Sequence, residues 1–317
     1  MPKFEPKNRP KNESPIADVK PQPAAPEPAE PQGPRVTALI VSYNSVDALR
    51  RSVRAVDATP GVEVLVVDLG SQDGSARIDS EFPNVTVLRL PKHFGATKAM
   101  NIATRTSGAD YVLYLDPHAV VDAGTVLGLA DVLDGNPDII AACPLLRSAE
   151  GGTACLQVYK LPDSSALAAA CESSAGSLAV AAPGSLDDAL VPVEFASRNA
   201  LIVRKDFIRG MNYFDERYGH AWGDLELAWQ IQNAQRKTVI ATKLGAVWYT
   251  PEPSATGTAT IADRYHGASG YLGKHNGFAA GLGFQLSAIF KALFAFQFGL
   301  LAALISGQKI DGTQSSL

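Results

Sequence analysis

From Val36 onward, the chain alternates between short apolar runs and longer amphipathic stretches. Almost continuous apolar runs predict four buried strands, at residues 35–44, 62–68, 85–90 and 109–116. Between them, residues 46–56 and 96–106 have the spacing of helices. Strands that alternate with helices predict an α/β domain with a parallel sheet that is covered on both faces.

Polar residues follow each predicted strand. In chain order they are Ser42, Tyr43 and Asn44, then Asp68, then Gly95 and Lys98 in LPKHFGATKAMN, and finally Asp116 and His118 in YVLYLDPHAVVD. Ligands of open α/β sheets bind beyond the carboxyl ends of the strands. We therefore expect a binding site at this edge of the sheet.

Glycine-rich phosphate-binding loops are absent from the sequence. VSYNSVD lacks the GxGxxG that would follow the first strand of a dinucleotide-binding fold, and GxxxxGK[ST] occurs nowhere. A divalent metal on carboxylates at a strand end is another way to neutralise a diphosphate.

Composition narrows the class of protein. With 317 residues, 46% of them hydrophobic, the chain can bury at least one full core. A net charge of -4 without a basic run argues against a nucleic-acid partner. The three cysteines are odd in number and lack metal-site spacing, which favours a reducing compartment.

Two segments have a composition unlike a packed domain. Residues 1–34 hold ten of the 21 prolines, which predicts a disordered tether, and no apolar core of a signal peptide follows the basic start. Residues 147–192 are rich in Ala, Ser and Gly and predict a variable loop or a lid on the acceptor side.

The stretch RNALIVRKDF, which follows, predicts a strand and a short helix. Its first two residues, Arg198 and Asn199, come just before the strand and would lie either in the site or on the surface.

The C-terminal part is strongly apolar. Residues 282–306 carry Lys291 as their only charge, and the window from Leu286 to Ile305 is long enough to cross a bilayer core of about 30 Å. Ser287, Lys291 and Gln297 define no narrow polar face, which weakens an interfacial reading. We expect membrane contact of some kind; the alternative is a helix packed on the α/β domain.

Five motifs resemble, in order, those of family 2 inverting glycosyltransferases, and among them the rhamnosyltransferase-like bacterial branch. They are VSYN, VVDLGSQDGS, KHFGATKAMN, YVLYLDPH and YFDERYGHAWGDLELAWQIQNAQRK. The resemblance covers roughly residues 36–250. It implies an α/β GT-A nucleotide-diphospho-sugar transferase fold, with a Rossmann-like, mixed and mainly parallel sheet. The expected parts are a tether at 1–34, a GT-A domain at 35–250 and a hydrophobic, membrane-associated helical tail at 251–317.

The resemblance also implies roles for single residues. Asp68 recognises the nucleotide base, Asp116 begins a DxD-like motif that binds metal and diphosphate, and Asp224 is the general base. The remaining donor-site candidates are Ser42, Tyr43, Asn44, Gly95 and Lys98, and those on the acceptor side are His220 and Trp222.

The sequence departs from the family pattern at three places. His118 stands where a second Asp is usual, Gly223 where Glu is more common, and Trp248 and Tyr249 where a His is frequent. The expected cofactor is a divalent metal, Mn²⁺ or Mg²⁺, with Asp116 and His118 as candidate ligands. Imidazole is a poor ligand for Mg²⁺, which favours Mn²⁺, or a metal held mostly by Asp116 and the phosphates.

Each candidate also has a structural interpretation. Asp68 and Asp116 are residue types that satisfy turn amides, and Asp224 is placed to cap a helix. His118 taken alone is typical of a solvated turn. The order of the motifs favours function for the carboxylates, but it adds nothing for His118.

We therefore expect an enzyme that transfers a sugar, with inversion, from a nucleoside-diphosphate sugar to a hydroxyl of a glycan or lipid-linked acceptor. The resemblance places it in cell-envelope polysaccharide synthesis, at the cytoplasmic face of the cell membrane. The alternative is a degenerate member that binds a sugar nucleotide or a partner without turnover. A nucleotidyltransferase would need a glycine-rich, basic signature, which VSYNSVDALRR lacks.

Overall fold

The computed structural model describes residues 33–151, 157–173, 176, 178–181, 185–251 and 256–310. From Gly33 onward the chain forms one compact unit. The tether predicted over residues 1–34 lies outside the described residues except for Gly33 and Pro34, and it stays a prediction.

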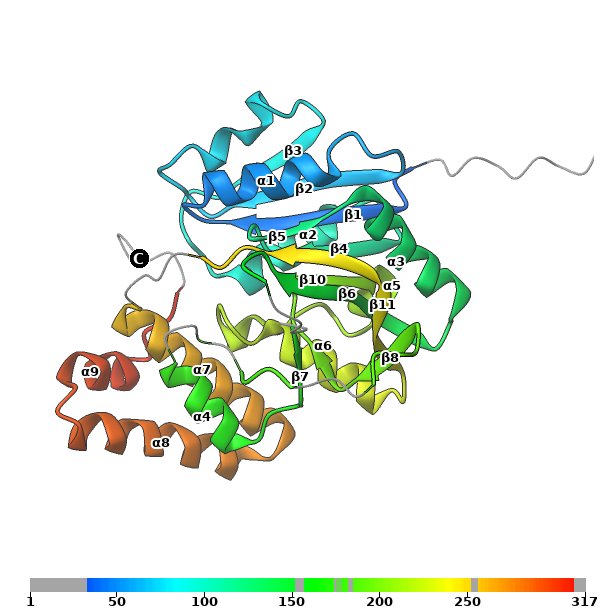
Figure 1. Ribbon diagram of the computed structural model, residues 1–317. Coiled ribbons are helices and arrows are strands. Elements are labelled where there is room, and N and C mark those ends of the chain that lie inside the picture. The colour runs from blue at the N-terminus through cyan, green and yellow to red at the C-terminus, as the bar shows by residue number, and fades with distance from the viewer. Residues whose placement is uncertain are drawn as a thin grey trace, which may run out of the picture. The chain divides into compact units, whose positions relative to one another are not determined.

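A sheet of nine strands forms the centre of this unit (Figure 1). The strand order is β3-β2-β1-β4-β10-β6-β11-β5, and β8 also pairs with β11. The strands are β1 Val36–Ser42, β2 Val62–Asp68, β3 Val85–Arg89, β4 Tyr111–Leu115, β5 Ala119–Val121, β6 Ile139–Ser148, β8 Leu190–Val193, β10 Ala200–Arg204 and β11 Lys237–Trp248. Strands β1, β2, β3, β4, β6 and β11 share one direction, whereas β10 runs antiparallel between β4 and β6. The predicted mixed, mainly parallel sheet is confirmed.

Alternate residues of the central strands pack against helices on opposite faces. In β1, Val36, Ala38 and Ile40 pack with the helices α1 and α3, while Leu39 packs with α2 and α6. These helices span α1 Val46–Val56, α2 Ala96–Thr106, α3 Ala123–Gly135 and α6 Gly223–Asn233; the shorter ones are α5 Lys205–Gly210, η1 Ser75–Ser80 and η2 Glu216–Tyr218. Burial on both faces explains why the strands are almost continuously apolar.

The prediction of a loop or lid over residues 147–192 is wrong in part. The described residues of this stretch include strand β7 (Val158–Tyr159), which pairs with β9 (Phe195–Ala196), and helix α4 (Ser164–Glu172). Asp163 caps α4 by accepting a hydrogen bond from the N–H of Ala166, and Leu167 and Cys171 are buried in the helical core. An alanine-rich stretch is a good helix former, and it needs few large side chains to pack closely.

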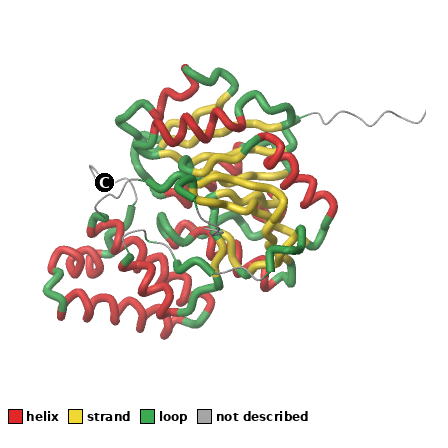
Figure 2. The backbone as a smooth tube through the Cα atoms, viewed as in Figure 1, coloured by secondary structure: helices red, strands yellow, loops and turns green. Residues whose placement is uncertain are grey.

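Three helices follow the sheet at the C-terminal end: α7 (Thr258–His275), α8 (Phe278–Phe294) and α9 (Phe298–Ser306). With α4 they form a helical group beside the strands (Figure 2). The chain turns between α8 and α9, where Phe296 has a φ of 57°. The apolar stretch is therefore two helices, and within the described ranges no helix is long and apolar enough to cross a membrane.

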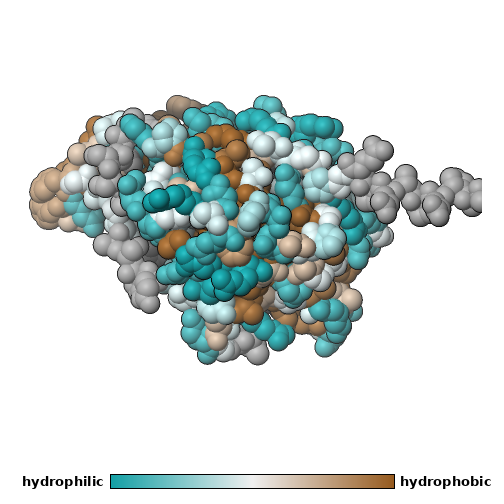
Figure 3. All heavy atoms as spheres, turned by 90° about the horizontal axis from the view of Figure 1, so that it is seen from above, coloured by the Kyte–Doolittle hydropathy of each residue, from teal (hydrophilic) through white to brown (hydrophobic). Residues whose placement is uncertain are grey.

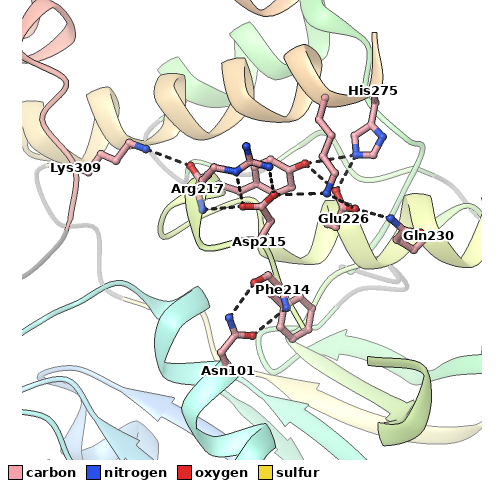
Figure 4. Close-up of polar contacts among 10 residues, drawn as sticks. Asn101, Phe214, Asp215, Arg217, Glu226, Gln230, His275 and Lys309 are labelled. Atoms are coloured by element: carbon pink, nitrogen blue, oxygen red, sulfur yellow. Dashed lines mark hydrogen bonds and ion pairs between the residues drawn. The ribbon is translucent and has the colours of Figure 1, made fainter. Parts of the chain in front are cut away.

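A buried carboxylate joins α6 to α7 (Figure 4). The side chain of Glu226 is 2% exposed and accepts hydrogen bonds from Tyr218, Gln230, Lys274 and His275, at 2.7 to 2.9 Å. Two of these donors lie on α7. The network holds the first turn of α6, which carries Asp224, against the C-terminal helices.

Candidate functional site

A pocket of about 190 Å³ opens where β1 and β4 end. It is lined by Leu39, Val41, Tyr43, Ser45, Leu69, His93, Ala96, Met100, Tyr114, Leu115, Asp116, Pro117, His118, Arg198 and His220. Tyr43, Asp116, His118 and His220 were predicted to be site residues. The structure thus brings together these predicted residues from three separate parts of the chain at the expected edge of the sheet.

Asp68 ends β2 beneath this edge and is 1% exposed. Its Oδ2 accepts hydrogen bonds from the N–H groups of Gly70 and Ser71, both at 3.0 Å. Its Oδ1 is buried and has no protein partner. A buried carboxylate oxygen without a partner costs free energy, so an N–H from a ligand would stabilise it. Asp68 does not itself line the pocket, so the neighbouring loop would have to move to expose this oxygen.

The residues after β1 shape the adjacent loop. Ser42 is buried, and its hydroxyl lies 3.0 Å from that of Ser45, which lines the pocket. Asn44 has a φ of 46°; its N–H donates to Ser71, and its Oδ1 accepts from the N–H of Gln72. Asn44 therefore ties two strand-end loops together but does not itself line the pocket.

Gly95 and Lys98 lie at the start of α2. Gly95 has a φ of 87°, a left-handed conformation that favours glycine, and a Cβ there would make a tight contact, 3.3 Å from the carbonyl oxygen of Ile310. Lys98 is exposed and does not line the pocket; its Nζ lies 5.1 Å from the centre of the Phe94 ring.

Asp116 and His118 are paired on the turn after β4. Oδ1 of Asp116 accepts from the backbone N–H of His118 at 2.8 Å and lies 3.0 Å from its Nδ1. The ring of Trp248 lies 6.0 Å from that of His118, and the N–H of Tyr249 donates to the His118 carbonyl. Trp248 and Tyr249 thus lie beside this turn, and neither residue type is a usual ligand for a divalent metal.

The side chains at this turn can supply only part of the ligands that a divalent metal needs. It offers one carboxylate and one imidazole, and across the described ranges no three His, Cys, Asp or Glu side chains gather closely enough to hold an ion. Mn²⁺ accepts both oxygen and nitrogen, whereas Mg²⁺ prefers oxygen. Phosphate oxygens and water would have to supply the remaining ligands.

Asp224 lies in the first turn of α6, with its side chain 9% exposed. Its Oδ2 accepts from the backbone N–H of Arg198 at 3.3 Å, and its Oδ1 lies 4.0 Å from Nη1 of Arg198. Burial raises the pKa of Asp224, while the nearby Arg198 charge and backbone N–H groups act in the opposite direction. A buried carboxylate with a raised pKa is suited to accept a proton. Asp224 does not itself line the pocket; Arg198, which contacts it, does.

His220 forms a wall of the pocket, whereas Trp222 faces the protein interior. The backbone N–H of His220 donates to Asp263 at 2.7 Å, and its Nδ1 accepts from the N–H of Ala96. Trp222 is 3% exposed and donates from its indole N–H to the carbonyl of Arg264. The acceptor-side role of both residues stays a prediction, and the position of Trp222 shows a structural function.

Two lining residues had weak sequence signals. Arg198 precedes its predicted strand and was open to a place in the site or on the surface, and His93 lies within KHFG without a predicted role. His93 packs edge-to-face on Tyr43, with ring centres 4.7 Å apart, and burial lowers its pKa to about 4. No sequence periodicity marks a loop residue as pocket-lining, so only the fold could select these two.

Residues 37–163 match the family model for Glycosyl transferase family 2. The matched region includes Asp68, Asp116 and His118 but ends before Arg198 and Asp224. Comparison with curated proteins gives no match.

Two solved structures have a similar fold. One is GalNAc-T7 with UDP, GalNAc and Mn²⁺, with a TM-score of 0.54, 13% identity, and coverage of 76% of this chain and 51% of that one. The other is the mannosyltransferase PcManGT from Pyrobaculum calidifontis in complex with GDP-Man and Mn²⁺, with a TM-score of 0.51, 17% identity, and coverage of 91% and 89%. The chain thus spans about half the length of the GalNAc-T7 chain. Residues 37–163 are therefore similar to glycosyl transferase family 2, and the chain shares its fold with these two structures.

Proposed function

We propose that this protein transfers a sugar, with inversion, from a nucleoside-diphosphate sugar to a hydroxyl of a glycan or lipid-linked acceptor. The observation that carries the proposal is the pocket at the carboxyl ends of β1 and β4, with Asp116 in its wall and Asp224 joined to it through Arg198. A family 2 match over the same strands supports it.

Asp68 and Asp116 are assigned to the donor. The partnerless Oδ1 of Asp68 would accept an N–H from the nucleotide base. Asp116 and His118 would hold a divalent metal, which supplies positive charge to the diphosphate; we favour Mn²⁺ on the chemistry of the two side chains. Both similar structures contain Mn²⁺, which agrees with this assignment.

Asp224 is assigned as the general base. The acceptor oxygen would form a bond to the anomeric carbon while the bond from that carbon to the diphosphate oxygen breaks. The hydroxyl proton passes to the Asp224 carboxylate, and the nucleoside diphosphate leaves with the bonding electron pair. A single displacement of this kind needs one base and one stabilised leaving group.

The exposed face of α8 and α9 supports a place on a membrane surface. Phe278, Phe294 and Phe296 are 76 to 80% exposed, and Phe290 and Phe298 are also exposed. Apolar surface is visible at the left-hand end of the view in Figure 3, where these helices lie. Residues 264–310 contain no Asp or Glu, which suits an anionic lipid surface. We propose attachment along this face, at the cytoplasmic side of the cell membrane.

A membrane-bound enzyme of this type would meet a cytosolic sugar nucleotide and a lipid-linked acceptor at one surface. This suits cell-envelope polysaccharide synthesis, with a hexose or deoxyhexose such as rhamnose as the transferred sugar. A degenerate binder without turnover is the second candidate, because His118 replaces a carboxylate and already pairs with Asp116.

A donor panel tests the proposal. The purified full chain is incubated with UDP-, GDP-, dTDP- and CDP-sugars, Mn²⁺ and membrane lipid extract, and mass spectrometry detects glycosylated lipid and released nucleoside diphosphate. Acceptor-dependent release of one nucleotide supports the transferase. Tight binding of one sugar nucleotide without release of its nucleoside diphosphate supports the degenerate binder. If none of the sugar nucleotides binds, both candidate functions are wrong.

A further inference from the structure

Arg198 contacts the proposed base and lines the proposed donor pocket. It lies between β9 and β10, and its side chain is 24% exposed. Its backbone N–H donates to Oδ2 of Asp224, and its Nη1 lies 4.0 Å from Oδ1. Asp224 does not itself line the pocket, so Arg198 connects the two.

The guanidinium is held in a fixed orientation. Nη2 donates to the carbonyl of His220 at 3.1 Å, and Nη1 donates to that of Ala221 at 3.4 Å. These two carbonyls precede α6, the helix that carries Asp224. A guanidinium has five N–H donors, so these bonds leave capacity for an anion in the pocket.

Arg198 is the one Lys or Arg among the residues that line the described pocket. His93 and His220 also line it, but burial lowers the pKa of both, so they are neutral near pH 7. Asp116 adds a negative charge to the same wall. A diphosphate entering this pocket therefore meets one permanent positive charge from the protein.

Asp224 needs a partner in order to stay ionised. Its carboxylate is buried, and the groups that stabilise its charge are the guanidinium of Arg198 and the backbone N–H groups of Arg198, Asp224 and Leu225. A guanidinium keeps its proton at any pH that a protein tolerates. Arg198 thus supplies a constant charge beside a carboxylate that burial would otherwise tend to protonate.

We propose that Arg198 joins the donor site to the base: its pocket side binds the diphosphate, and its other contacts position Asp224 as a carboxylate. This inference rests on the proposed function, since it needs a nucleoside diphosphate in the pocket. Arg198 is then a substrate contact for the leaving group and a positioning residue for the base.

Binding measurements test the contact with the diphosphate. Isothermal titration with Mn²⁺ present compares UDP, GDP, dTDP and CDP with the corresponding nucleosides. Loss of a charged hydrogen bond to phosphate should weaken binding of the preferred diphosphate to Arg198→Gln by about 10- to 100-fold. Its nucleoside should bind as to the parent. Arg198→Lys should recover part of the loss because it keeps the charge.

Titration of Asp224 tests the second contact without any need for the donor sugar. Carboxyl ¹³C NMR of aspartate-labelled protein, assigned with Asp224→Asn, reports the protonation of this side chain. The midpoint for Asp224 should move to higher pH in Arg198→Gln and stay near the parent value in Arg198→Lys. Arg209→Gln is the matched control, because Arg209 is an exposed arginine paired with Asp206 on α5.

The outcomes separate the two hypotheses. If the parent binds none of the four diphosphates, both the proposed function and this inference are wrong. If the parent binds one of them and Arg198→Gln binds it equally well, or if the Asp224 midpoint does not move, the role of Arg198 is wrong while the proposed function stands. A general loss of both nucleoside and diphosphate binding would indicate a purely structural role and would also overturn the inference.

Discussion

The carboxylate of Asp116 is hydrogen-bonded to His118, two residues further along the Asp-Pro-His turn that follows β4. One oxygen accepts from the His118 backbone N–H at 2.8 Å and lies 3.0 Å from Nδ1. A carboxylate can only accept, so the Nδ1 proton points to Asp116. Asp116 and His118 therefore present one carboxylate and one imidazole, where an Asp-x-Asp sequence would present two carboxylates.

This pairing leads to a prediction about metal preference. His118→Asp should raise activity with Mg²⁺ relative to Mn²⁺, because Mg²⁺ prefers oxygen ligands. Titrating both metals into the parent and the variant measures the ratio. Asp116→Ala is the comparison variant and should weaken donor binding strongly. Identical metal profiles in parent and His118→Asp would show that His118 does not touch the ion.

Replacing the proposed base should remove transfer but not binding. Asp224→Asn keeps an acceptor for the N–H of Arg198 but cannot take a proton, so the rate should fall by about 10²- to 10⁴-fold. The dissociation constant of the donor should change little. Turnover within a few-fold of the parent would mean that another group is the base.

The pH dependence of the parent should reflect the buried state of Asp224. A base works only when deprotonated, so activity is lost as pH falls through its pKa. Burial raises this pKa, and the acidic limb of kcat/KM should therefore lie at higher pH than for an exposed aspartate. A rate that stays constant down to the pH where exposed aspartates titrate would contradict the assignment.

Asp68 should contribute to recognition of the nucleotide base. Asp68→Ala removes the buried, partnerless Oδ1, and nucleoside binding should weaken by roughly 10- to 100-fold, as expected for a charged hydrogen bond. Asp73→Ala is a suitable control, because Asp73 accepts bonds from the N–H groups of Val46 and Ser75 in the neighbouring loop. Equal loss of binding in both variants would point to loop disruption.

The exposed face of α8 and α9 should bind lipid. A triple variant with Phe290→Ser, Phe294→Ser and Phe298→Ser should bind anionic vesicles more weakly than the parent. Each substitution should lower the affinity by at least about tenfold, since burying a Phe contributes roughly 1.5 kcal/mol or more. Flotation of the full chain measures this, with Val180→Ser as an exposed control elsewhere. Equal flotation of the triple variant and the parent would remove the membrane proposal. Point variants are preferable to truncation because the opposite face of α8, with Phe284 and Ala288, is part of the core.

Glu226 should be needed for stability and not for chemistry. Glu226→Ala leaves buried donors such as His275, 5% exposed, without their acceptor, and should lower the free energy of unfolding by roughly 3 to 5 kcal/mol. Urea unfolding followed by circular dichroism measures this. Glu81→Ala, which breaks an exposed pair with Arg50, should have little effect. Similar losses in both variants would contradict the importance of burial.

Local pattern was sufficient for the strands that carry the donor site. Strands β1, β2 and β4 are largely buried on both faces, so most of their positions are apolar whichever face is considered. The edge strand β3 is partly exposed, and its apolar run is correspondingly shorter. The polar ends of β2 and β4, Asp68 and Asp116, were found for the same reason: a carboxylate at the end of a buried run stands out. The helix α4 was missed because small side chains give almost no periodic pattern.

By itself, the sequence determined the α/β class, the edge of the sheet that carries the pocket, and the order of the motifs, because these depend on residues close together in the chain. Only the tertiary structure decided that β10 enters antiparallel between β4 and β6, that the apolar C-terminal stretch turns at Phe296, and that Arg198 meets Asp224. These features depend on contacts between distant segments. Burial of apolar surface and the pairing of charges stabilise these contacts, and a short stretch of sequence holds only one of the two partners.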